Sequence, residues 1–164
     1  MGRPLRTRID FAKTLSWYDF FHNQLIAFGK IKNDFGLAKL LCKDTEKSHE
    51  SNLFKKYKFG LSTPQQEWID IIDSKCIGSS NIINHSIWKN LKYRTTEEKL
   101  ILIELNNLPN YIFENLIING HIKDFNKSDL EKLAQYGSLD SLCALYLLHQ
   151  WGYSIGSTSL VNDC

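Results

Sequence analysis

The polar residues best suited to recognition chemistry lie in one short stretch, residues 51–58, which reads SNLFKKYK. In a helix, Leu53, Phe54 and Tyr57 would face inward and leave the other side chains outside. These outer residues are Ser51, Asn52, Lys55, Lys56 and Lys58. In a helix that reads a DNA groove, the first exposed polar residues reach base edges and later lysines meet phosphates. A solvated lysine face is the alternative, and this helix alone does not decide between the two.

Residue patterns typical of catalysis do not occur in the sequence. It has no Gly-rich phosphate loop, no H-E-x-x-H and no G-x-S-x-G. Cys143 and His149 lie six residues apart on one predicted helix, so they do not share a face as a nucleophile and its base would. The widely spaced cysteines form neither a C-x-x-C pair nor a zinc cluster with the histidines, which favours reduced thiols. We therefore predict no enzyme activity, no cofactor and no metal site.

A second cationic group stands near the N-terminus, where Arg3, Arg6 and Arg8 alternate with small or polar residues. Residues 1–10 contain too few apolar side chains to pack, so we predict a mobile basic arm. A flexible arginine arm can enter a narrow minor groove, where the negative potential is enhanced. The Gly2-Arg3-Pro4 triplet resembles the centre of an AT-hook, an element that binds the minor groove of A·T-rich DNA.

The basic residues are concentrated in the first part of the chain. Residues 1–94 carry 16 Lys and Arg against 9 Asp and Glu, and residues 95–164 carry 4 against 9. The first part therefore has a net charge of +7 and the second of −5. A basic part favours a polyanionic partner, because lysines placed on phosphates release condensed counterions. Ordinary solvated surface is the other interpretation.

Apolar spacing and capping residues predict an all-α chain. The predicted helices cover residues 14–28, 35–42, 50–59, 63–76, 87–91, 97–108, 109–120, 130–136 and 138–152. Thr14 is the expected N-cap of the first helix. Capping boxes are expected at Thr95 with Glu98 and at Ser128 with Glu131. Five short helices would then form an N-terminal domain, followed by a small C-terminal helical bundle.

Phe54, Tyr57, Gly60 and Pro64 fall at intervals of three, three and four. This pattern resembles the end of the helix-turn-helix unit in Cro/C1-type (XRE-like) DNA-binding domains. In that family two anchoring side chains hold the recognition helix, a glycine ends it and a proline opens the next helix. The resemblance implies that the helix predicted over residues 50–59 is the recognition helix. Lys58 stands where the family commonly has an acidic residue.

Leu37 and Ala38 resemble the first helix of the same unit, in which a small alanine lets the recognition helix cross closely. Asn33 or Asp34 can cap this helix. Residues 43–50 exceed the tight turn that usually joins the two helices, so they are either an insertion or an extension of the first helix. Trp68 and Trp88 are expected to complete the core.

The predicted domains are a basic arm of residues 1–10, a helix-turn-helix-like domain of residues 11–94, a C-terminal helical region of residues 95–152 and a flexible tail of residues 153–164. Residues 142–148 are apolar almost all round the last helix. Such a helix must be buried on most of its circumference, within its own bundle or against another subunit.

The expected function is binding of duplex DNA by a transcriptional regulator, with dimerisation through the C-terminal helices. The alternative is a non-catalytic adaptor or inhibitor that binds protein or RNA in a bacterial anti-phage defence or mobile-element system. The Gly78-Ser79-Ser80 turn followed by His85 and Trp88 also resembles a segment of uncharacterised bacterial proteins associated with mobile elements. No apolar run reaches the roughly 20 residues of a membrane helix, so we expect a cytoplasmic protein.

Overall fold

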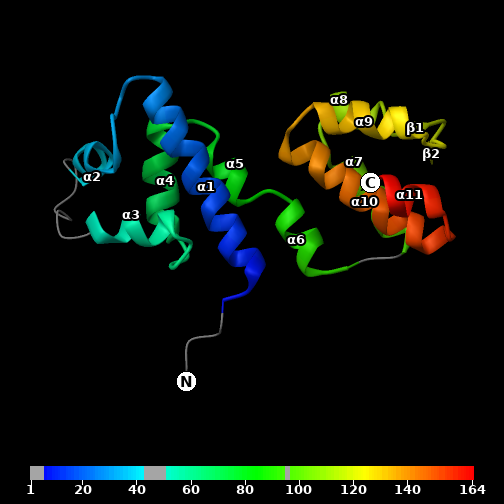
Figure 1. Ribbon diagram of the computed structural model, residues 1–164, viewed down its shortest axis with the longest axis horizontal. Helices are drawn as coiled ribbons and strands as arrows, with labels where there is room; N and C mark the ends of the chain where they lie inside the picture. Colours follow the sequence, from blue (N-terminus) through cyan, green and yellow to red (C-terminus); the bar gives the residue numbers. More distant parts are fainter. Residues whose placement is uncertain (1–5, 43–50, 95–96) are drawn as a thin grey trace. The chain divides into compact units, whose positions relative to one another are not determined.

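The computed structural model describes residues 6–42, 51–94 and 97–164. The chain divides into two compact units between Trp88 and Lys89. This division precedes the boundary expected at residues 92–96 by a few residues. The described residues form an all-α fold that also contains one β-hairpin, whose two strands have two residues each. Figure 1 labels the elements along the chain.

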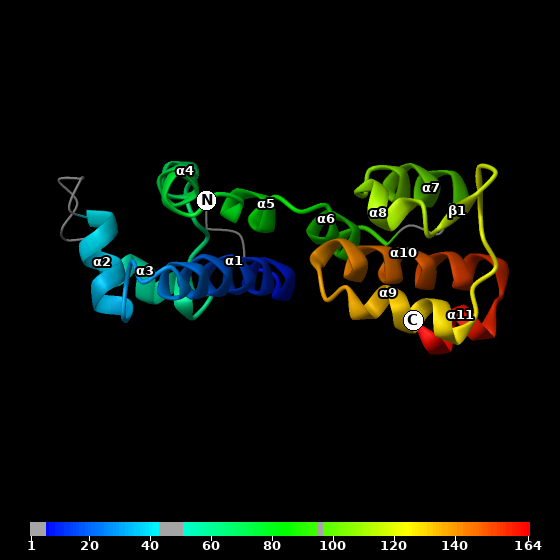
Figure 2. The ribbon, with the colours of Figure 1, turned by 90° about the horizontal axis from the view of Figure 1, so that it is seen from above.

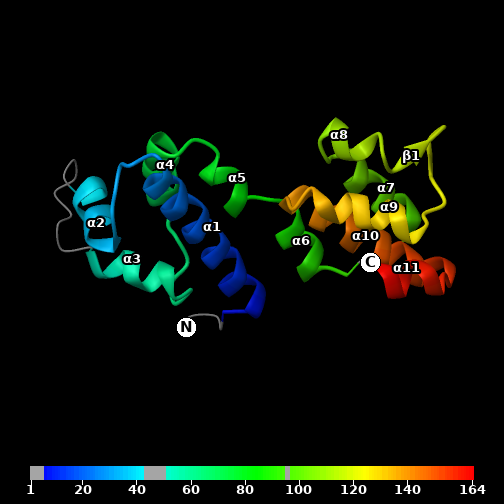
Figure 3. The same ribbon diagram turned by 45° about the horizontal axis from the view of Figure 1, so that its top comes forward.

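Unit 1 is built around its longest helix. Its helices are α1 (Arg8–Ala27), α2 (Asp34–Cys42), α3 (Ser51–Lys58), α4 (Gln66–Lys75) and α5 (Ser79–Ile83), and α6 (Ile87–Lys92) crosses the division between the units. Helix α1 packs against α3 and α5, while α2 packs against α3 and α4 against α5. In Figure 3, α2 and α3 lie next to each other at one end of this unit. The recognition-helix candidate α3 is therefore held from two sides.

An aromatic cluster fills the centre of unit 1. Trp17, Phe21, Tyr57 and Trp68 are fully buried, and apolar residues from α1, α2, α4 and α5 surround them. Burying a large aromatic side chain removes about 150–250 Å² of surface from water. This cluster is the main apolar source of stability in a unit made of short helices, which are marginal by themselves in water.

Unit 2 surrounds a central apolar helix. Its elements are α7 (Glu98–Asn106), α8 (Asn110–Phe113), β1 (Ile117–Ile118), β2 (His121–Ile122), α9 (Lys127–Gln135), α10 (Leu139–Ile155) and α11 (Thr158–Asp163). Helices α7 and α8 lie along one side of α10, and α9 and α11 lie along the other (Figure 2). Residues Cys143, Ala144, Leu147 and Leu148 of α10 are buried. The apolar circumference of α10 is thus covered largely within its own chain.

The first helix starts earlier than predicted, so the prediction of Thr14 as its N-cap is wrong. Thr7 caps α1 through a capping box with Asp10. Thr14 is buried, and its hydroxyl donates to the carbonyl oxygen of Asp10 at 2.9 Å. The last residues of the expected arm of residues 1–10 therefore belong to the helix. Thr7 and Asp10 fulfil the reciprocal capping-box pattern in the sequence itself.

The helix predicted over residues 109–120 is also incorrect. Helix α8 ends at Phe113, and β1 pairs with β2 around Asn119 and Gly120. These two residues have φ values of 52° and 80°. Asn-Gly is the sequence that favours a two-residue hairpin, because both positions require positive φ.

Two more helices in unit 2 begin with other capping residues than predicted. Helix α9 is capped by Asn126 with Asp129, two residues before the expected pair of Ser128 and Glu131. Helix α7 follows Glu97, which makes no side-chain cap, and the expected cap Thr95 lies outside the described residues.

The expected flexible tail is helical in the structure. Helix α10 continues to Ile155, and α11 packs against it with Leu160 buried. A Cβ atom added at Gly152 would come within 2.6 Å of the Cβ of Leu160. The glycine in α10 therefore lets α11 approach closely, a contact that the Ser- and Gly-rich composition of this segment does not reveal.

Candidate nucleic-acid interface

Helix α3 has two chemically different faces, as the spacing of its residues predicts. Phe54 and Tyr57 are buried, whereas Asn52, Lys55 and Lys56 are exposed. Among the described residues, the side chains of Lys55 and Lys56 form no ion pair. Two ammonium groups and one amide are thus presented to solvent on a short, anchored helix.

Aromatic contacts fix the angle of α3 on the core. The ring centroids of Tyr57 and Trp17 lie 5.6 Å apart, and those of Phe54 and Trp68 lie 5.0 Å apart, both in edge-to-face geometry. Such pairs contribute roughly 0.5–1.5 kcal/mol beyond the burial of their surface. The buried face of α3 is therefore anchored to α1 through Tyr57 and to α4 through Phe54.

The turn after α3 has the predicted glycine geometry. Gly60 has φ +60°, and its N–H donates to the carbonyl oxygen of Tyr57 at 2.9 Å. Pro64, however, does not open α4. It is buried two residues before Gln66, the first helical residue, and Gln65 is the N-cap. Proline restricts the residue before it to extended backbone, so here it shapes the connection and the helix begins after it.

Arg6 is attached to the protein core, contrary to the prediction that it belongs to a free arm. Its guanidinium donates to the carbonyl oxygen of Gly60, and also to Asp10 O at 3.0 Å and Thr14 Oγ1 at 2.9 Å. The side chain thus ties the start of α1 to the turn that ends α3. Arg8 lies exposed in the first turn of α1. Arg3 lies outside the described residues.

Asp34 of α2 contacts side chains of α1 and α3 and so joins three helices. Its Oδ2 lies 2.6 Å from Lys58 Nζ, and its Oδ1 lies 3.0 Å from His22 Nε2. The hydroxyl of Tyr18 donates to Oδ1 at 3.3 Å. The hydrogen bond from Lys58 is the largest influence that lowers the pKa of Asp34, while burial and then Asp34 raise the pKa of Tyr18.

This arrangement changes the expected role of Lys58. Its ammonium group pairs with Asp34 and connects α3 to α2, so it is not presented freely to a phosphate as Lys55 and Lys56 are. A cation at the end of α3 also interacts favourably with the helix dipole.

A groove of about 330 Å³ lies on this surface between α2 and α3. Ala38 of α2 and Asn52 and Lys55 of α3 line it together with Phe35 and Phe59. Phe35 is 79% exposed and Phe59 is 51% exposed. Residues expected to bind nucleic acid therefore share one concave surface with two solvent-facing aromatic rings.

The remaining predicted motif residues have structural positions. Leu37 is fully buried in α2, and Ala38 is half-buried. Trp88 is buried, and its indole N–H donates to the carbonyl oxygen of Ile82 at 2.7 Å. Ser51 begins α3, but its side chain lies outside the described residues, as does the whole of residues 43–50.

Sequence reasoning missed the tertiary roles of Arg6, Phe11 and Asp34. A Cβ atom added at Gly60 would come within 2.6 Å of the Phe11 ring, so that ring covers the turn directly. No short-range pattern connects residues 6 and 60. Asn33 was one of two cap candidates, and it is the cap: its Oδ1 accepts from Gly36 N at 3.0 Å. That assignment leaves Asp34 free to pair with Lys58.

Within residues 6–42, 51–94 and 97–164, no group of three or more His, Cys, Asp or Glu side chains could hold a metal ion. Over these residues, no helix has both the length and the apolar character needed to cross a membrane.

Comparison with known proteins gives no relative for this arrangement, because no family model, curated protein or solved structure matches the chain.

Proposed function

We propose that this protein binds duplex DNA through the exposed face of α3, in the manner of a Cro/C1-like helix-turn-helix regulator acting in the cytoplasm. The observation that carries the proposal is the division of α3 into an anchored aromatic face and an exposed polar face. Phe54 and Tyr57 hold the helix, and Asn52, Lys55 and Lys56 remain available. Groove-reading helices combine these two properties, since side chains must reach the bases from a fixed position.

The polar residues are assigned different tasks by their chemistry. Asn52 lies in the first turn of α3, and an amide can pair with both N6 and N7 of an adenine. Lys55 and Lys56 lie farther along, where ammonium groups meet phosphates and set orientation. Asn52 would therefore supply selectivity, and the two lysines would supply affinity that does not depend on sequence.

Substitutions on α3 test these assignments. Asn52→Ala should relax the preference at one base pair by about 1–3 kcal/mol when binding is selected from a random duplex library. Lys55→Gln and Lys56→Gln should weaken binding to every duplex alike. Lys99→Gln in α7 is a matched control that removes an exposed lysine from unit 2. The proposal is wrong if the control reduces binding as much as the α3 variants do.

A second candidate is binding of an acidic protein at the same surface, as an adaptor would. Phe35 and Phe59 favour it, because exposed aromatic rings beside a groove are more typical of protein partners than of phosphate contacts. Phe35→Ser would then abolish capture of the partner but leave DNA binding little changed.

Binding to RNA would appear as competition by single-stranded or hairpin RNA for the duplex probe.

Dimerisation follows from the size of α3, which is only eight residues long. One short helix reads few base pairs, and helix-turn-helix proteins usually pair two half-sites. In unit 2, the exposed Leu100 and Ile103 lie three residues apart on α7 and give an apolar face for a second copy. Ile103→Glu should shift the sedimentation coefficient from dimer to monomer, whereas Lys127→Glu, an exposed change on α9, should not.

A further inference from the structure

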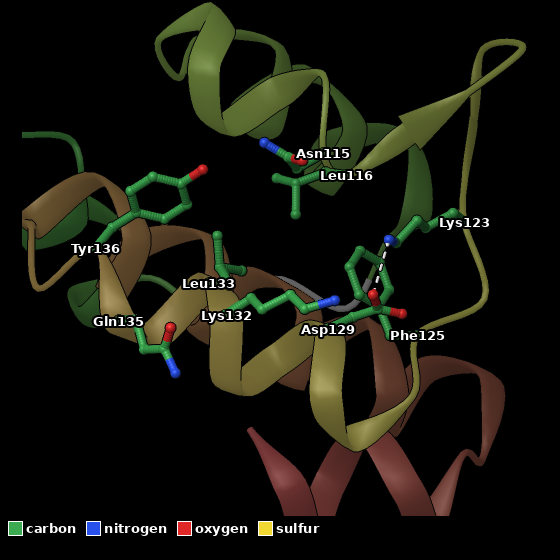
Figure 4. Close-up of a pocket in the computed structure, with 9 residues that line it drawn as sticks. All are labelled: Asn115, Leu116, Lys123, Phe125, Asp129, Lys132, Leu133, Gln135 and Tyr136. Carbon is green, nitrogen blue, oxygen red and sulfur yellow. Dashed lines mark ion pairs between the residues drawn. The ribbon is translucent and has the colours of Figure 1, made fainter.

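Unit 2 contains a pocket of about 400 Å³ between the β1–β2 hairpin and α9 (Figure 4). The binding of DNA proposed for α3 does not use it. Its volume falls within the range of about 300–1,000 Å³ that is usual for small-molecule sites.

The floor of the pocket is apolar and its ends are aromatic. Leu116 and Leu133 are buried and point toward each other in Figure 4, with Tyr136 at one end and Phe125 at the other. The Tyr136 ring is held by an edge-to-face contact with Tyr111, at a centroid distance of 5.7 Å. Because the two leucines are almost fully covered, the apolar surface open to a flat ligand is that of the Phe125 and Tyr136 rings.

Charged side chains gather at the Phe125 end. Lys123 Nζ lies 3.3 Å from Asp129 Oδ1 and 5.1 Å from the centroid of the Phe125 ring. Asp129 Oδ2 also accepts a hydrogen bond from the backbone N–H of Asn126, the N-cap residue of α9. Lys132 extends toward the same end in Figure 4 and makes no ion pair with any of the described residues. Two ammonium groups and one carboxylate leave one positive charge uncompensated.

We propose that this pocket binds an aromatic compound carrying a single negative charge. Its ring would lie between the Phe125 and Tyr136 rings, and its anionic group would meet the ammonium of Lys132. The ring faces of Phe125 and Tyr136 favour a planar ligand over a branched aliphatic one.

The charges and the apolar lining of the pocket disfavour three other classes of ligand: neutral aromatic compounds, polyanions and small hydrophilic anions. A neutral ring makes no ion pair with Lys132. The second negative charge of a polyanion would be repelled by the carboxylate of Asp129. A small hydrophilic anion leaves the apolar floor uncovered. Only a monoanion with an aromatic body matches both parts of the pocket.

The test is an NMR titration of the ¹⁵N-labelled full chain with 2-naphthoate. We expect saturable shifts at α9 and the hairpin with a Kd of about 1 mM or lower, the affinity typical of a ligand this small. The neutral analogue 2-naphthamide should bind at least about fivefold more weakly, because it lacks the charge that Lys132 meets. Lys132→Met should cause a similar loss. Lys127→Met is the matched control on the same helix, since Lys127 is exposed and does not line the pocket.

Each result decides the proposal. It is supported if naphthoate binding depends on Lys132 and not on Lys127. It is overturned if no saturable shift occurs up to about 5 mM, if the amide binds as well as the acid, or if the two lysine variants behave alike. These outcomes do not depend on DNA binding, which can be measured on the same samples.

Discussion

Gly60 combines a left-handed backbone with close contact from another helix, and these two constraints can be separated by mutation. Gly29 also has positive φ, at +68°, but a Cβ atom there would meet nothing within 4 Å. Gly29→Ala should therefore cost only the backbone strain, about 1–2 kcal/mol. Gly60→Ala should cost about 0.5–1.5 kcal/mol more, because its Cβ would overlap the Phe11 ring, which is 44% exposed and has to turn into a less favourable rotamer. Urea unfolding measures both, and equal losses would mean that Phe11 does not cover the turn.

Asp34 gives a pH-dependent contribution to stability. Its pKa is lowered in the folded protein, chiefly by Lys58, so the stabilisation is complete above the usual carboxyl range and is lost as the pH falls through the lowered value. Its side chain is 50% exposed, so Asp34→Asn should cost only about 0.2–1 kcal/mol at neutral pH. The difference from the wild type should vanish once the pH falls below the lowered pKa, where the native carboxyl also becomes neutral.

At the scale of the elements, the anchoring of α3 depends on buried aromatic side chains. Tyr57→Ala or Trp68→Ala should each lower the free energy of unfolding by about 3–5 kcal/mol, because both side chains are fully buried. Phe35→Ala serves as the control, since this ring is 79% exposed on α2. Differential scanning calorimetry would show the effect, and an unchanged melting temperature in the Tyr57 variant would contradict the assignment of α3 to the core.

The sequence predicted those elements whose signals are local. The apolar spacing of α3 and the positive φ of Gly60 follow from a few neighbouring residues, and both are confirmed. The clamp from Arg6 to Gly60 spans 54 residues and has no local signal. The hairpin at Asn119 follows an apolar run that also fits a helix, so the helical periodicity alone does not reveal it, although Asn-Gly favours a two-residue turn.

At the scale of the whole molecule, the division at Lys89 can be tested with fragments. Asn90 Nδ2 donates to Cys143 Sγ at 3.5 Å, and Arg94 Nε donates to Gln150 Oε1 at 2.8 Å. A fragment of residues 89–164 should therefore be helical by circular dichroism and melt cooperatively. A fragment of residues 97–164 lacks both contacts and should melt at a lower temperature, since each lost hydrogen bond costs about 0.5–1.5 kcal/mol. If both fragments melt alike, the division lies farther along the chain, near residues 92–96.

The most direct measurement of the central proposal is a titration of the full chain against labelled duplex DNA from about 50 to 200 mM salt. We expect binding at the lower salt and a log–log slope of about −0.9 for each phosphate contacted. The double variant Lys55→Gln, Lys56→Gln should make that slope less negative by about 2. The absence of binding at the lower salt, or a slope unchanged in the double variant, would contradict the assignment of α3 as the DNA-binding helix.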